Sequence, residues 1–320
     1  MLRTFLFAPK AHRAFGACPR PAFVPLGFAP RNWPALRAKA VPILLIPHPT
    51  GSPIVLDLPP PIPPGTSSIR IPRSKAAAMR VLLETVQRGS RYWTGGVLPT
   101  HKALPLSKKF AERYTITASA ATRSRNKARG ISNATLIFYP ENEAALTPLR
   151  WWLLVTPGNG RVWDEEQLRR DTGKRRERLT WGEQYVLVHL QHDRKQGGGR
   201  HWTWCVSDAH YEELEAAMRQ YASAHGNSDG MERTDDLERL VAAIRRMPGF
   251  HGIRQQQWAL YTLGKSCWNR THKIPWPGWP QEIPYVDKRQ PVYHRPEPLR
   301  LDVLVQLQAR RSGTLTQSLS

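Results

Sequence analysis

Four apolar runs of strand length in the middle of the chain constrain the fold more than any other feature. They are rich in β-branched and aromatic residues and read ATLIFY at 134–139, RWWLLVT at 150–156, QYVLVHL at 184–190 and RHWTWCV at 200–206. Turn signals separate them, namely Pro140, the PGNG sequence at 157–160 and the glycines at 197–199. With a shorter RYWT run at 91–94, they predict a mostly antiparallel sheet of four to five strands.

Helical patterns flank these runs on both sides. We expect helices at 102–113, 119–129, 164–171, 208–224, 235–246 and 252–264. Asp208 and Thr234 are suitable N-caps for the fourth and fifth of them. The predicted class is therefore α+β, a mostly antiparallel sheet flanked by helices, with a helical C-terminal portion and extended termini.

The composition changes along the chain and suggests four regions. Residues 1–78 hold ten Lys or Arg against one acid and include the proline run PPPIPP, so we expect a basic extension that is disordered or not part of the fold. Its first 20 residues resemble a transit peptide, and a true start at Met79 is the alternative. We then expect an α+β basic core domain at 79–225, a helical hairpin at 226–266 and a Pro/Trp-rich extended arm and tail at 267–320.

The chain is strongly basic, with a formal net charge of +22 and a pI near 10.6. Such an excess predicts DNA or RNA as partner, because each phosphate that Lys or Arg neutralises releases counterions. An Arg-rich coding sequence or a basic organelle environment are the plainer explanations. The basic composition, rich in Trp and Arg, suggests a cytoplasmic protein of a bacterial plasmid or other mobile element.

Several functions are disfavoured by the sequence. No apolar run approaches the length of about 20 residues that spans a bilayer, so we expect no membrane association. The three cysteines, Cys18, Cys205 and Cys267, lack paired spacing, which argues against a disulfide framework and a zinc knuckle and favours a reducing compartment. We predict no cofactor and no metal.

Three segments carry the candidate nucleic-acid contacts; a solvated surface is the alternative for the first two, and a helical hairpin that binds no DNA is the alternative for the third. The first is the expected helix at 119–129, the second a Gly-rich hairpin at 191–200, and the third a turn at 247–249 followed by a helix, which resembles a helix-turn-helix in outline. Their candidate residues are Arg123, Arg125, Lys127 and Arg129; Arg194, Lys195 and Arg200; and Arg254 and Gln255, with Gln256 beside them. Trp202 and Trp204 share one strand face, which we expect to be core rather than a platform for bases.

One cluster offers an alternative with catalysis. It consists of His189, His192 and His201, with Tyr211 or Tyr221 on the following helix. Metal-binding histidines on an antiparallel sheet beside a tyrosine nucleophile resemble the HUH endonucleases, a likeness that implies nicking of single-stranded DNA. The chain departs from that family because His189 and His192 are three residues apart and point to opposite faces of a continuous strand.

Two further alternatives use parts of the same region. A metal-independent RNA endonuclease would employ His192, Lys195 and His201 for proton transfer. A subunit of a nucleoprotein assembly would bind nucleic acid with its basic surfaces and a protein neighbour with the acidic stretch at 208–240. The sequence favours binding over catalysis and leaves the enzyme question open.

Overall fold

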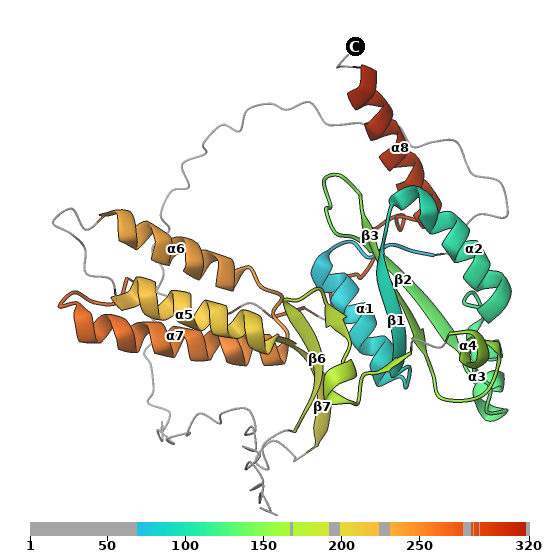
Figure 1. Ribbon diagram of the computed structural model, residues 1–320, viewed down its shortest axis with the longest axis horizontal. Helices are drawn as coiled ribbons and strands as arrows, with labels where there is room; N and C mark the ends of the chain where they lie inside the picture. The colour runs from blue at the N-terminus through green and yellow to red at the C-terminus, as the bar shows by residue number, and fades with distance from the viewer. Residues whose placement is uncertain are drawn as a thin grey trace, which may run out of the picture. The chain divides into compact units, whose positions relative to one another are not determined.

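Eight α-helices and seven strands form the described part of the chain (Figure 1). A computed structural model describes residues 69–166, 169–191, 199–223, 231–277, 283, 285–287 and 289–317. The predicted α+β class is confirmed, as is the helical C-terminal part. No helix among these residues is long and apolar enough to cross a bilayer.

The strands form two sheets rather than one. The first is antiparallel with strand order β2-β3-β1-β4 and contains β1 (Tyr92–Leu98), β2 (Ala134–Pro140), β3 (Leu149–Val155) and β4 (Arg170–Asp171). The second has the order β5-β6-β7 and contains β5 (Thr180–Trp181), β6 (Tyr185–Gln191) and β7 (Arg200–Val206). The four long runs are thus strands, but the sheet of four to five strands divides after β4.

Helix α1 (Lys75–Gln87) packs between the two sheets, against β2 and β7. Ser74 caps it, since its Oγ accepts a hydrogen bond from Ala77 N at 3.2 Å. Met79 and Leu82 are fully buried in a core shared with both sheets. Within this core the indole Nε1 of Trp204 donates to Met79 O at 2.8 Å. Trp204 is therefore core, as the pattern of the strand predicts.

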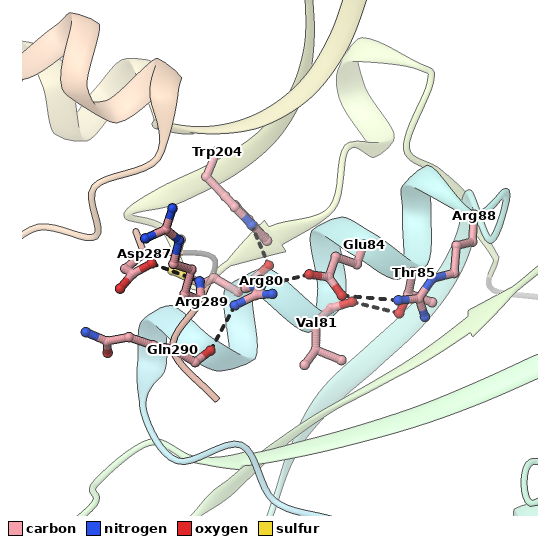
Figure 2. A network of polar contacts seen from close by, with 10 residues as sticks. Arg80, Val81, Glu84, Thr85, Arg88, Trp204, Asp287, Arg289 and Gln290 are labelled. Carbon is pink, nitrogen blue, oxygen red and sulfur yellow. Dashed lines mark hydrogen bonds and ion pairs between the residues drawn. The ribbon is translucent and has the colours of Figure 1, made fainter. Parts of the chain in front are cut away.

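Polar contacts also hold α1 to a distant segment of the chain (Figure 2). Arg80 Nε donates to Glu84 at 2.8 Å, and Arg80 Nη1 donates to the carbonyl of Gln290 at 3.1 Å. Arg88 pairs with the other oxygen of Glu84 at 3.1 Å. The segment around Gln290, which we expected in an extended arm, is thereby fastened to the first helix of the fold.

The chain segments before α1 and before α8 (Leu301–Gln317) lie side by side. Ile71 N donates to Leu299 O at 2.8 Å, and Leu301 N donates to Ile69 O at 3.0 Å. Ile71 is only 1% exposed, so residues 69–78 belong to the fold, upstream of the boundary we placed at Met79. The tail at 301–317 is a helix where an extended tail was expected, because Leu301 and Leu304 bury one face.

Helices cover the other face of the first sheet. These are α2 (Ala103–Tyr114), the short α4 (Arg161–Glu165) and α8, which surround a second core containing Phe110, Phe138 and Leu153. The helix expected at 164–171 is wrong for most of its length: α4 begins earlier, at Arg161, and ends at Glu165, and the chain has entered strand β4 at Arg170.

Three helices follow the second sheet and pack side by side (Figure 1): α5 (Asp208–Ser223), α6 (Met231–Arg245) and α7 (His251–Thr271). Gly252 N donates to Thr203 Oγ1 at 3.1 Å, and Gln256 bonds both the N–H and the carbonyl of Val206. Helix α7 continues past Gly264, where we expected it to end, because that glycine packs against Met218 of α5.

Trp204→Phe tests the contact between α1 and the second sheet. The variant loses the indole hydrogen bond to Met79 O and part of a fully buried ring, so we expect the free energy of unfolding to fall by about 1–3 kcal/mol. Trp202→Phe is the matched control on the same strand; its ring is half-buried, and we expect a loss below about 1 kcal/mol. Urea denaturation of both variants provides the comparison, and equal losses would contradict the role given to Trp204.

Gly252→Ala tests the docking of α7 on β7. A Cβ at Gly252 would lie 2.3 Å from Cys205 Sγ and 2.7 Å from the backbone oxygen of Trp204. Alanine usually stabilises a helix interior over glycine by about 1 kcal/mol, but here we expect a net loss of about 1–3 kcal/mol. Gly264→Ala, whose Cβ would meet the flexible Sδ of Met218 at 2.6 Å, should cost less in the same thermal melts. A stabilised Gly252→Ala variant would refute this packing.

Candidate nucleic-acid interface

The register of the first sheet gathers basic segments at one end of it. Ala134 pairs with Val155, Val155 with Tyr92, and Tyr92 with Asp171, so these four residues form one row across the sheet. Neighbouring strands lie about 4.8 Å apart, so the row is about 15 Å wide. The segments that precede β1 and β2 and those that follow β3 and β4 therefore lie at the same end of the sheet.

We call this the basic end and define it as residues 88–91, 119–133, 156–165 and 169–178. It includes α3 (Ala120–Ala128), which precedes β2, and α4, which follows β3; Figure 1 shows the two helices together at the lower end of the first sheet. The turn before β1 and the turn after β4 complete it. Segments that are far apart in sequence thus share one surface.

Arg123 stabilises the fold at the basic end rather than facing solvent. Its guanidinium donates to the carbonyls of Ala118 (3.1 Å) and Ile116 (2.8 Å) and to the hydroxyl of Thr135 (2.8 Å). Burial lowers the pKa of Arg123 from its ordinary value, although an arginine keeps its charge in proteins. Arg123 therefore connects α3 to β2 through its own hydrogen bonds and does not share the unpaired face expected of the four cations.

The other three predicted cations of α3 do project outward. Arg125, Lys127 and Arg129 are exposed, and none of them forms an ion pair with a carboxylate in the part of the chain that the structure describes. Asn126 Nδ2 donates to Asn133 Oδ1 at 3.1 Å, which fastens this helix to the segment before β2. The three charges are thus displayed on a backbone that is held in place.

A basic turn after β4 was missed in the sequence. Residues 169–178 read RRDTGKRRER, with six bases against two acids, but the first three belong to the expected helix at 164–171 and the rest precede the expected strand at 184–190. This local excess of basic residues is the sequence signal that could have identified the segment. In the structure Lys174, Arg175 and Arg176 are exposed on it.

Asp171 shapes this turn from the inside. Its carboxylate accepts hydrogen bonds from Arg91 at 2.6 and 3.1 Å and from Gly173 N at 2.9 Å. Burial by itself would raise the pKa of Asp171, but the hydrogen bonds from Arg91 and Gly173 outweigh it and lower the pKa. Glu177 reinforces the turn by accepting a bond from Asp171 N at 2.8 Å.

Most acids at the basic end are already paired. Glu165 bonds both Arg113 and Arg161, and the hydroxyl of Tyr114 donates to Glu165 at 3.0 Å and to Glu166 at 2.7 Å. Burial, followed by these two bonds, raises the pKa of Tyr114 and keeps it protonated. The carboxylates therefore neutralise other partners and leave the charges of α3 uncompensated.

The remaining candidate binding residues lie elsewhere or outside the described residues. Arg254 and Gln255 belong to α7; the guanidinium of Arg254 lies 3.3 Å from the ring centre of Tyr285, and Gln255 is exposed. Gln256 bonds the backbone of β7. This face of α7, the helix expected to read bases, is therefore covered by the second sheet. Arg200 is exposed at the start of β7, whereas Arg194 and Lys195 fall outside the described residues.

The histidines of the catalytic alternative do not converge. His189 pairs with Trp202 across the second sheet and His201 pairs with Leu190, so the two imidazoles project from opposite faces. The ring of His201 contacts that of His251 at 5.1 Å, while His192 falls outside the described residues. Tyr211 and Tyr221 pack against the core. No group of three His, Cys, Asp or Glu that can hold a metal occurs within the described ranges.

Asp171→Asn tests the lowered pKa. Below the ordinary aspartate pKa of about 4, the unfolded chain gains a proton before folded Asp171 does, so stability is lost as the pH falls through the lowered pKa. We expect the variant to lose about 1–2 kcal/mol at pH 7 and to show a flatter decline from pH 5 to pH 2. Asp164→Asn, at an exposed site on α4, is the control for pH-dependent urea denaturation. A decline as steep as wild type in Asp171→Asn would contradict the assignment.

No protein family matches the chain, and neither a curated protein nor a solved structure matches it. The functional conclusion therefore depends on the charge and geometry of the described residues.

Proposed function

We propose that the chain binds nucleic acid through phosphate contacts at the basic end of the first sheet. The observation that carries the proposal is the shared row of Ala134, Val155, Tyr92 and Asp171, which gathers the cations of α3 and of the turn at 174–176. Arginine and lysine form strong charge-assisted hydrogen bonds to phosphate oxygens, and contacts to the nucleic-acid backbone need no base sequence.

Two simpler explanations account for only part of this surface. Basic residues in the last turn of a helix are stabilised by its dipole, which suits Lys127 and Arg129. The dipole of α3 gives no reason for the exposed cations of the turn after β4, where Lys174 pairs with Glu177 at 3.2 Å and Arg175 with Asp208 at 3.8 Å. Arg176 forms no ion pair among the described residues. Solubility likewise explains a net charge but does not require several segments to present the same sign on one surface.

Removal of the three exposed cations of α3 tests the proposal. In the full-length chain, Arg125→Gln, Lys127→Gln and Arg129→Gln together should lower affinity for a DNA or RNA oligonucleotide about tenfold or more at low salt. The slope of log affinity against log salt concentration should decrease in magnitude by about 2 to 3, because each lost phosphate contact removes about 0.7–0.9. A fluorescence anisotropy titration over a range of salt concentrations measures both quantities.

The matched control removes the same charge elsewhere. Arg245, Arg246 and Lys273 are exposed on or just after α6 and just after α7, and their replacement by Gln should leave most of the slope unchanged. Arg123 is kept, since its replacement would disturb the junction of α3 with β2. Equal slopes for wild type and the α3 variant would refute the proposal.

A further inference from the structure

Helix α7 carries a stripe of aromatic and basic side chains along one flank. We define the aromatic stripe as Arg254, Trp258, Tyr261 and Lys265, with Tyr285 beside Arg254. The four helix positions are separated by four, three and four residues, so they lie within about 60° of one another around the axis. From first to last they extend about 16 Å at 1.5 Å per residue.

Trp258, Lys265 and Tyr285 expose the stripe to solvent, whereas Arg254 and Tyr261 are half-buried. Trp258 is 56% exposed and Tyr285 is 73% exposed, which places both among the most exposed large apolar side chains of the described residues. The rings of Trp258 and Tyr261 lie 5.1 Å apart and are inclined by 30°. Ile253, Leu260 and Cys267 on another side of α7 already fill the core, so the fold does not need Trp258 there.

The charged side chains of α7, the helix that carries the stripe, are all basic. The 21 residues of α7 contain no Asp or Glu, whereas Arg254, Lys265 and Arg270 are basic. The Nε of Arg254 is buried without a hydrogen-bond partner, while its guanidinium stacks on Tyr285. Asp287 follows Tyr285 by two residues and accepts a hydrogen bond from Arg289 N. Aromatic faces flanked by cations complement a polyanion that has exposed flat groups.

We propose that the aromatic stripe stacks against unpaired bases, so that single-stranded nucleic acid is the preferred ligand; this inference rests on the proposed function. Bases in a duplex already have both faces covered by their neighbours, and only unpaired bases can lie against a protein ring. Isolated exposed aromatic residues are common on protein surfaces. Here an arginine and a lysine lie on the same flank at helical spacing, which is the combination that single-strand binding uses.

Trp258→Ala in the full-length chain tests the inference against a single-stranded oligonucleotide and a duplex of the same sequence at one salt concentration. Stacking on one base corresponds to a loss of about 5- to 150-fold in single-strand affinity. We expect this loss for the single strand only, with duplex affinity unchanged within about twofold. Trp258→Phe keeps a ring face and should restore part of the affinity. Ile274→Ala removes a 62% exposed apolar side chain without an aromatic ring and is the control that should behave as wild type.

The outcomes separate this inference from the proposed function. If wild type binds neither oligonucleotide, both fail. If wild type binds both and the α3 variant loses affinity while Trp258→Ala does not, the stripe has no role and the phosphate interface stands. If Trp258→Ala leaves binding intact but abolishes self-association in sedimentation velocity, the stripe is an interface between copies of the chain and the stacking inference is overturned.

Discussion

The buried helix α1 is the constraint on which the rest of the structure depends. Met79 and Leu82 are fully buried, and the Met79 carbonyl accepts the indole hydrogen bond of Trp204 from the second sheet. On its exposed side Arg80 bonds the carbonyl of Gln290 (Figure 2). One helix therefore joins two sheets and a segment more than 200 residues away, and a chain that began at Met79 would lack its Ser74 cap.

The net charge of +22 includes arginines that are bonded within the fold and cations that remain exposed. Arg123 donates hydrogen bonds at the junction of α3 and β2, and Arg91 neutralises buried Asp171. Arg125, Lys127 and Arg129 remain outside these contacts and are exposed. Arginines at the basic end are thus either bonded within the fold or exposed, and the hydrogen-bond acceptors within reach of each guanidinium decide which.

The sequence predicts what depends on local pattern and misses what depends on distant partners. Strands β2, β3, β6 and β7 and helix α3 lie within a residue or so of the predicted bounds, because β-branched runs and the Ser119 cap are local signals. Strand β1 continues to Leu98, four residues beyond the predicted run, because its Gly-Gly pair carries no strand signal. The division into two sheets depends on which strands pair, and the opposite faces of His189 and His201 follow from that register. Helix α8 was missed because its apolar spacing begins only at Leu301, after a proline-rich stretch.

The two proposed surfaces divide the recognition of nucleic acid by its chemistry. The basic end presents cations without aromatic rings on α3, which suits phosphates, and the stripe of α7 presents rings with few cations, which suits bases. Contacts within the fold join α7 to α1, since Gly252 and Gln256 dock α7 on β7 and Trp204 of β7 bonds α1. Residues 88–91 of the basic end directly follow α1. Phosphate contacts weaken steeply with salt whereas stacking depends little on it. At high salt the residual affinity should therefore come from the stripe and favour unpaired bases.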